Sequence, residues 1–326
     1  MGNSYPDRTN ASGVWKINEI SKNKVTHNTY PDGSKRALFG GGNTGSASDI
    51  IEHIQLVSTG NGTDFGNLSV ARRLGGTAAS STRAVFANGS DPATDVIDYV
   101  QYATLGNASD FGDAQTSATT RASSMCNGTR GIWGGGDDNP NSPRNIDILD
   151  YITIATTGDA ADFGNLSVGR WGTNKGIISS TTRGITAGGA TPTHSNVIDY
   201  VTINTLGNAI DFGNLTETKY QNAGGSSHTR GLIGGGQDKT SIDVITIASL
   251  GNAVGFGDIS AANDGLAAAN DIQRVAWGGG SVPGRVNTIE FVNINSAGNA
   301  VDFGDLTAAR DNPQGNCGSH GGIRSY

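Results

Sequence analysis

One repeated phrase constrains the fold of this chain more than any other feature of the sequence. Residues 198–215 read IDYVTINTLGNAIDFGNL, which is an alternating β run, a Gly-Asn turn, and Asp-Phe-Gly followed by Leu. Variants of the phrase occur six times, at intervals of 46, 52, 49, 44 and 47 residues between their phenylalanines: Phe65, Phe111, Phe163, Phe212, Phe256 and Phe303. A period in the forties, built from short β runs and Gly-rich turns, predicts a radially repeated β architecture.

Further β-type segments flank the phrase in each repeat. Before the alternating run stands a short run that begins with Arg and ends in glycines, such as RALFGGG at Arg36 and RGIWGGG at Arg130. After the phrase comes a run of small residues, such as GGTAASS, which suits a strand crowded near a central axis. We therefore predict four strands per repeat, namely a small-residue inner strand, a Gly-terminated second strand, an alternating third strand and a Phe-Gly outer strand. Four such strands make one propeller blade.

The two ends of the repeat region predict how the ring closes. The region enters at a second strand, at Arg36, and leaves after a small-residue run at residues 311–322. The C-terminal run should supply the inner strand of the first blade, which removes open sheet edges. We predict an all-β, six-bladed β-propeller over residues 35–326, with its first blade closed by the C-terminal strand. Residues 1–34, with Trp15 in the segment GVWKINEI, are expected to form an arm for attachment or docking.

Composition limits the classes of partner. The net charge is -7 and no basic run occurs, which argues against nucleic acid and anionic membranes as partners. No apolar stretch approaches the ~20 residues of a membrane span. The two cysteines, Cys126 and Cys317, form neither a disulfide framework nor a zinc site, and we expect both to be small buried residues.

The blades arranged in this way resemble kelch repeats. The double glycine that ends the second strand follows the kelch order, as does the acidic-aromatic pair of the third strand, seen at Asp98 and Tyr99 and at Asp199 and Tyr200. The Phe of Asp-Phe-Gly stands where kelch repeats usually have Trp. The resemblance covers residues 35–326 and implies a propeller of kelch-like blades.

The amino-acid sequence of the repeat, together with SGVW at residues 12–15, resembles that of repeat-bearing virion proteins of marine bacteriophages, notably cyanophages. That resemblance implies a non-enzymatic structural or tail-associated virion protein, made in the host cytoplasm. Residues 1–34 would contact other virion proteins, and the propeller would contact a host-surface glycan or protein. The alternative is a glycan-binding propeller of a secreted bacterial protein, which predicts exposed aromatic residues. Its candidates are Trp133, Trp171 and Trp277, for which packing between blades is the competing interpretation.

One arginine opens the second strand of every blade and gives the first candidate site. Six guanidinium groups at one height would form a basic collar that captures a sulfated or carboxylated glycan. Each third strand also carries an acid, so internal ion pairs are the alternative, which we favour because a structural requirement predicts repetition in every blade. The collar arginines are Arg36, Arg83, Arg130, Arg183, Arg230 and Arg274, and the acids are Glu52, Asp98, Asp150, Asp199, Asp243 and Glu290.

The longest loop after a second strand, DDNPNSPRN at residues 137–145, is the first candidate for recognition. Binding residues concentrate on loops that a rigid scaffold carries. The candidate binding residues in this loop are Asp137, Asp138, Asn139, Asn141 and Arg144.

The sequence carries no signature of catalysis or of a metal or cofactor site. No GxSxG elbow, HExxH motif, P-loop or dinucleotide fingerprint occurs in context. The repeated Asn-x-x-Asp, as at Asn208 and Asp211, has too few regularly spaced oxygens for a calcium loop, and we expect it to cap turns. His228 and His320 occupy equivalent positions in non-adjacent blades, and no carboxylate or Cys accompanies both. We predict no metal, no cofactor and no enzymatic activity.

Overall fold

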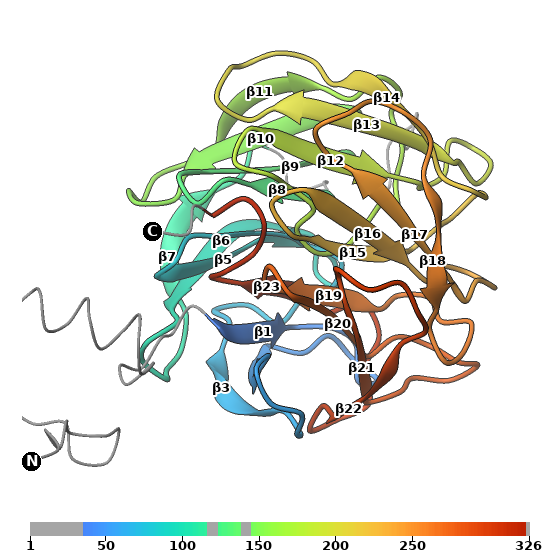
Figure 1. Cartoon of the computed structure of the whole chain (residues 1–326). Coiled ribbons are helices and arrows are strands. Elements are labelled where there is room, and N and C mark those ends of the chain that lie inside the picture. The colour runs from blue at the N-terminus through green and yellow to red at the C-terminus, as the bar shows by residue number, and fades with distance from the viewer. Residues whose placement is uncertain (1–34, 116–122, 138–144, 324–326) are drawn as a thin grey trace, which may run out of the picture.

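The computed structural model describes residues 35–115, 123–137 and 145–323. Six antiparallel sheets stand around a central axis as the blades of a propeller, which confirms the predicted all-β fold (Figure 1). From the inner to the outer strand, blade 1 contains β23 (Gln314–Cys317), β1 (Arg36–Gly40), β2 (Ile50–Gln55) and β3 (Thr63–Asn67), and blade 2 contains β4 (Gly76–Ala79), β5 (Arg83–Gly89), β6 (Thr94–Gln101) and β7 (Ser109–Asp113). In the same order, blade 3 contains β8 (Ser123–Cys126), β9 (Arg130–Gly134), β10 (Ile148–Thr153) and β11 (Ala161–Asn165), and blade 4 contains β12 (Arg183–Ala187), β13 (Val197–Thr202) and β14 (Ile210–Asn214). Blade 5 contains β15 (Ala223–Ser226), β16 (Arg230–Gly234), β17 (Ser241–Thr246) and β18 (Val254–Asp258), and blade 6 contains β19 (Ala267–Asn270), β20 (Arg274–Gly278), β21 (Thr288–Asn293) and β22 (Val301–Asp305).

The C-terminal strand closes the ring as predicted. Strand β23 pairs antiparallel with β1, with Ala37 opposite Cys317 and Gly40 opposite Gln314. The first blade is thus assembled from both ends of the repeat region, and β23 also lies against the inner strands β19 and β4 of the neighbouring blades. Every residue of β23 is buried, because the small side chains of the inner strands meet around the axis.

Blade 4 departs from the predicted four strands. Its inner segment forms only isolated bridges, in which Lys175 pairs with Ala223 and Ile177 pairs with Ser124 of the neighbouring blades, and Ser179 pairs with Gly184. At Gly176 φ is +111°, a conformation that favours glycine, and a Cβ there would lie 2.4 Å from a backbone oxygen of blade 5. The inner segment of this blade therefore does not form a regular strand.

The outer strand of each blade bonds to the hairpin of the next blade. In the first such contact, Gly106 N donates to Phe65 O at 2.8 Å and Ala108 N donates to Asn67 O at 2.7 Å. A Cβ on Gly66 would lie 2.2 Å from Gly106 O, so this approach requires glycine. The Phe-Gly and Gly-Asn parts of the repeated phrase are thus the two halves of one contact between blades.

The asparagine of the Gly-Asn turn has a role that the sequence did not predict. Asn208 Oδ1 accepts a hydrogen bond from Asn165 N of the preceding blade at 3.0 Å, and Asn107 Oδ1 accepts from Asn67 N at 3.1 Å. Asp162 Oδ1 accepts a hydrogen bond from Gly164 N at 3.1 Å, which lies inside β11 and not in the turn. Turn capping is the wrong role for these asparagines, because their side-chain oxygens bond to the preceding blade instead.

Glycines at the ends of the second strands admit aromatic rings from the neighbouring blades. A Cβ on Gly40 would lie 2.7 Å from Phe86 of blade 2, and one on Gly234 would lie 2.9 Å from Trp277 of blade 6. Both rings are completely or almost completely buried. The core therefore lies between blades, where each blade buries its faces against its two neighbours.

Truncation tests whether closure stabilises the whole ring. Removal of residues 311–326 deletes β23, so β1 loses its inner partner and the inner strands β4 and β19 lose their common neighbour. We expect the truncated chain to lose its cooperative thermal transition in calorimetry. A truncated protein that melts like the full-length chain would exclude closure by the two ends.

Candidate functional site

The two ends of the ring differ in what they display. Because neighbouring strands are antiparallel, the inner-to-second turns and the third-to-outer hairpins lie at one end, here called the turn face. The loops that follow the glycines of the second strands lie at the opposite end, the loop face. Lys35 precedes a second strand, and residues 318–323 follow an inner strand. Both ends of the main described region therefore lie at the turn face.

The six collar arginines lie at the turn face but do not pair with the third-strand acids. Within the described ranges, none of the ion pairs joins a collar arginine to such an acid, so the favoured internal-pair hypothesis is wrong. Arg83 stands opposite Gln101, whereas Asp98 stands opposite Phe86. Since side chains alternate along a strand, the arginine and the acid of one blade project to opposite faces.

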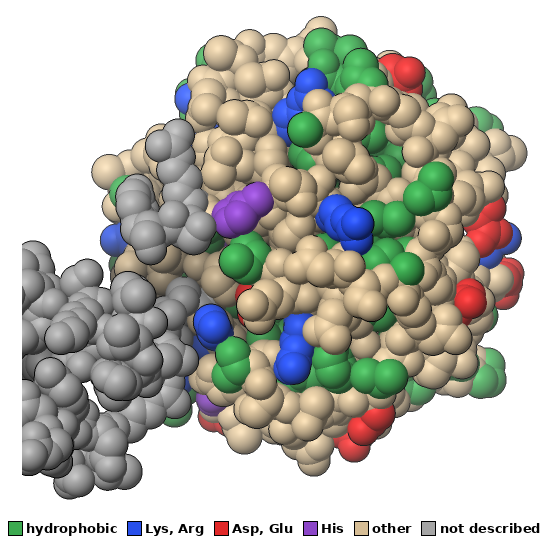
Figure 2. Space-filling view, in the orientation of Figure 1, with side chains coloured by type: hydrophobic (Ala, Val, Ile, Leu, Met, Phe, Trp, Pro, Cys, Tyr) green, Lys and Arg blue, Asp and Glu red, His purple; other side chains and the backbone are tan. Residues whose placement is uncertain are grey.

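Each collar arginine instead joins its blade to the next. Arg83 Nη1 donates to Ile154 O at 3.1 Å, and Arg274 Nη1 donates to Leu56 O at 2.7 Å, which connects the last blade to the first. The Arg83 guanidinium also lies 4.8 Å from the centre of the Tyr99 ring, a cation–π distance. Lys and Arg side chains appear as separate spots on the viewed face rather than as one basic patch (Figure 2). Anion capture by the collar stays a prediction, with part of each guanidinium already engaged.

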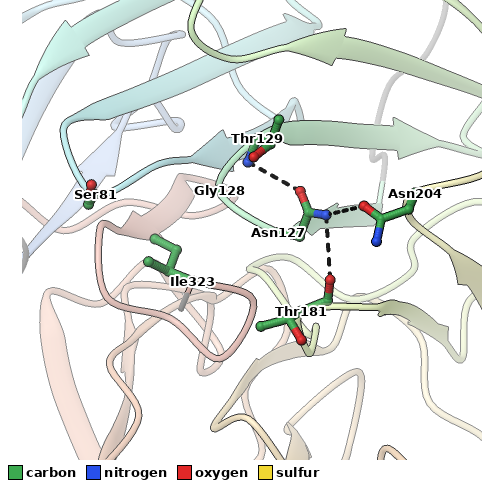
Figure 3. A pocket seen from close by; sticks show the side chains of 7 residues that line it. All are labelled: Ser81, Asn127, Gly128, Thr129, Thr181, Asn204 and Ile323. Atoms are coloured by element: carbon green, nitrogen blue, oxygen red, sulfur yellow. Dashed lines mark hydrogen bonds between the residues drawn. The ribbon is translucent and has the colours of Figure 1, made fainter. Parts of the chain in front are cut away.

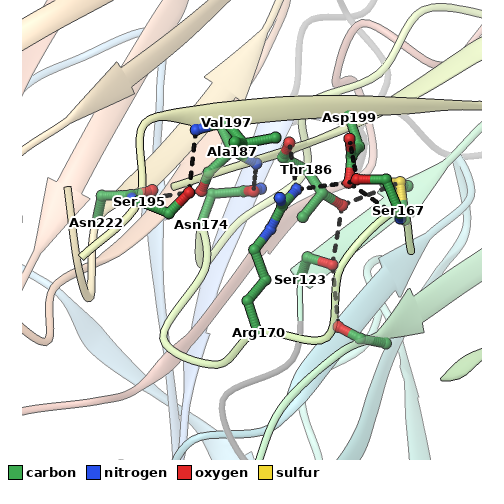
Figure 4. Close-up of polar contacts among 12 residues, drawn as sticks. Ser123, Ser167, Arg170, Asn174, Thr186, Ala187, Ser195, Val197, Asp199 and Asn222 are labelled. Carbon is green, nitrogen blue, oxygen red and sulfur yellow. Dashed lines mark hydrogen bonds and ion pairs between the residues drawn. The ribbon is translucent and has the colours of Figure 1, made fainter. Parts of the chain in front are cut away.

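Three of the third-strand acids pair with a different set of basic residues, which follow the outer strands. Arg170 Nη2 donates to Asp199 Oδ2 at 2.9 Å, and Ser167 Oγ donates to the same carboxylate at 2.7 Å (Figure 4). Both members of the ion pair are completely buried. Burial lowers the pKa of the Arg170 guanidinium from its ordinary value, and the Asp199 charge opposes that shift. The connection between blades 3 and 4 is thus held by a desolvated pair.

Equivalent buried pairs occur at two other junctions. Arg72 and Asp98 lie 2.9 Å apart between blades 1 and 2, and Arg310 pairs with Glu52 between blades 6 and 1. Between blades 4 and 5 a lysine, Lys219, takes the basic position, and its Nζ donates to Ser241 O at 2.5 Å. The last pair adds an ionic contact to the closure that β23 makes.

The residues after β23 cover the centre of the ring at the turn face. His320 is completely buried, and its Nε2 lies 3.0 Å from Cys126 Sγ and 3.3 Å from Ala79 O. Gly322 N donates to His320 Nδ1 at 3.0 Å, so the neutral ring carries its proton on Nε2. Burial lowers the pKa of His320 to about 4 and raises the pKa of the Cys126 thiol to about 12. Both groups are neutral at pH 7, and their contact holds residues 318–323 in place.

A second histidine contacts the same segment. His228 Nδ1 lies 2.8 Å from Gly321 O, so the histidine at the repeat position equivalent to His320 also contacts residues 318–323. Beside this segment lies a cavity of about 330 Å³ (Figure 3). Asn127 in its wall donates to Asn204 Oδ1 at 2.8 Å and accepts from Thr129 N at 3.2 Å. This side chain is therefore already satisfied by its neighbours.

The predicted recognition loop is described only at its edges. Asp137 lies at the loop face, where it forms a β-bridge with Asn145. The other candidates, Asp138, Asn139, Asn141 and Arg144, lie outside the described residues, as does Trp15 of the predicted arm.

An aromatic cluster lies at the loop face next to that loop. The ring of His194 stacks on Tyr220 at 5.0 Å with planes 13° apart, and Trp171 meets Tyr220 edge-on at 4.8 Å. Trp171 is partly exposed and His194 is exposed. The adjoining Arg170 accepts, through its carbonyl, a hydrogen bond from Gly136 N at the start of the loop. The cluster thus lies beside Gly136, where the loop begins.

The sequence did not assign Tyr220 or His194 to a site. They come from separate segments that only the folded chain brings to Trp171, and no local pattern marks them. The packing interpretation is confirmed for the other two tryptophans, since Trp133 and Trp277 are buried and Trp277 Nε1 donates to Ala223 O across a blade boundary at 3.1 Å.

The chain matches no known family model, and no curated protein matches it in sequence. In the described parts of the chain, no group of three or more His, Cys, Asp or Glu side chains is placed to hold a metal ion. The same parts contain no helix with the length and apolar character needed to span a membrane.

Loss of one buried carboxylate should destabilise the ring strongly. In Asp199→Ala the Arg170 charge stays buried without its partner, which should reduce the free energy of unfolding by about 3–5 kcal/mol in chemical denaturation. Asp302→Ala is the control, because Asp302 is an exposed acid at the equivalent outer-strand position of blade 6, away from this pair, and should change stability by less than about 0.5 kcal/mol. Equal effects of the two substitutions would contradict a structural role for the pair.

Proposed function

We propose that this protein is a non-enzymatic structural or tail-associated component of a phage virion, which attaches through residues 1–34 and presents its loop face to the host surface. One observation carries the proposal. Lys35, where the propeller begins, lies at the turn face, so attachment through the preceding residues directs the loop face away from the particle. The amino-acid sequence of the repeat, which resembles that of virion proteins of marine bacteriophages, supports the assignment to a virion.

The loop face suits recognition because its loops differ while the blades repeat. The loops run from a short turn after Gly236 to the long segment after Gly136. The ring beneath them is closed by β23 and by buried ion pairs, which makes it a rigid support. Loops on a rigid scaffold bind partners without a large loss of conformational entropy.

Deletion of residues 1–34 tests the attachment. We expect the shortened protein to fold, with the circular dichroism and melting transition of the full chain, and to be absent from purified particles by immunogold labelling. The full chain should be found at the tail or capsid surface. Unchanged incorporation of the shortened protein would contradict attachment through these residues, and absence of the full chain from particles would contradict the virion assignment.

Glycan binding is a second candidate function, and the aromatic cluster at the loop face favours it. Sugar rings pack against exposed aromatic faces, and Trp171 and His194, which both contact the buried Tyr220 ring, offer such a surface. Trp171→Ala should lose signals that the wild-type protein gives on a glycan array, whereas Trp171→Phe should keep part of them. An array without wild-type signals, or with signals unchanged by Trp171→Ala, would exclude this site as the glycan contact.

A further inference from the structure

Blade 5 departs from the repeat at one place on its outer strands, near the turn face. Its third strand has Val244 where the other blades carry a ring, and Gly255 replaces the aspartate of Asp-Phe-Gly. The facing turn of blade 6 presents Ala297, a small residue. The rings at the position of Val244 are His53, Tyr99, Tyr151, Tyr200 and Phe291.

These small residues make the cavity in blade 5 larger than its equivalent in a matched blade. The space lined by Arg230, Val244, Val254 and Phe256 has a volume of about 400 Å³. The equivalent depression in blade 2 is lined by Tyr99 and has about 200 Å³. The collar arginine and the Phe of Asp-Phe-Gly line the space in blade 5 but not the smaller one in blade 2, where the tyrosine ring lines it instead.

Arg230 differs from the other collar arginines in its surroundings. It is exposed, whereas the other five are partly buried. Its Nη1 donates to Ile294 O at 3.2 Å, as the repeat requires. Among the described residues no ring lies beneath its guanidinium, while Arg130 and Arg183 each lie 4.6 Å from a tyrosine ring centre. In blade 5 the cation thus faces a space where a ring stands in other blades.

The backbone does not require glycine at position 255. Its φ is outside the left-handed region, and a Cβ there would meet nothing within 4 Å. A side chain would fit without strain, so the effect of the glycine is to keep the cavity open and to leave a negative charge out of it.

We propose that this cavity is a binding site for a small aromatic acid, whose ring takes the place of the missing tyrosine ring. The ring packs on Val244 and Phe256 with the Arg230 guanidinium over its face. The acid group is matched by the positive charge of Arg230, the one charged side chain in the lining. The inference is independent of the virion assignment, because it rests on one blade of the propeller.

Phenylacetate is the probe, titrated into the full chain and followed in ¹⁵N–¹H spectra through the Gly255 and Leu250 amides. We expect saturable shifts with a Kd of about 1 mM, typical of a ligand of this size. Cyclohexylacetate has the same charge and a saturated ring, and should bind about tenfold more weakly because it lacks the cation–π contact. Equal affinity for the two acids would overturn the aromatic site, as would the absence of phenylacetate binding.

Substitutions locate the site. Val244→Tyr restores the ring of other blades and should abolish binding, and Gly255→Asp restores the acid and should weaken binding at least about tenfold by repulsion. Tyr99→Val is the matched control in blade 2 and should keep the wild-type affinity at the Gly255 amide. Phenylacetate binding that survives both Val244→Tyr and Gly255→Asp would overturn the proposal, whether or not one of the two variants folds less well.

Discussion

The backbone contact between the outer strand of one blade and the hairpin of the next is the interaction on which the ring depends. It places two glycines face to face, as at Gly66 and Gly106, and a Cβ on the first would overlap the carbonyl of the second. The contact returns at the closing junction, where Gly60 N donates to Phe303 O at 2.8 Å. Because half of each contact belongs to the neighbouring blade, no blade satisfies its own outer strand, and the blades stabilise one another around the ring.

Two repeated sets of arginines join blades in this protein. One set of arginines, such as Arg83, donates to backbone carbonyls of the next blade at the turn face. A second set, such as Arg170, holds a buried carboxylate where the chain crosses between blades. Both sets are repeated, as a structural requirement demands. The two proposed binding sites lie where the repeat is broken, at the aromatic cluster around Trp171 and at the cavity beside Arg230.

These two places lie at opposite ends of the ring, and this separates their proposed roles. The cluster around Trp171 lies at the loop face, which points away from residues 1–34 in the proposed attachment. The cavity in blade 5 lies beside the hairpins of the turn face, near Ala297 of blade 6. A large partner at the loop face and a small ligand at the hairpins would not compete for the same surface.

The repeated phrase predicted the number of blades, the segments that flank it predicted the order of strands, and the two ends of the repeat region predicted the closure by the C-terminal strand. Period-two alternation and Gly-rich turns are local patterns, and their repetition at a constant interval leaves few other arrangements. Only the folded ring decided which basic residue meets which acid, because Arg83 and Asp98 project to opposite faces of one blade while Arg72 reaches Asp98 from the preceding crossover. The aromatic cluster at the loop face was likewise decided by tertiary structure, since its rings come from three separate segments and meet only when two blades pack side by side.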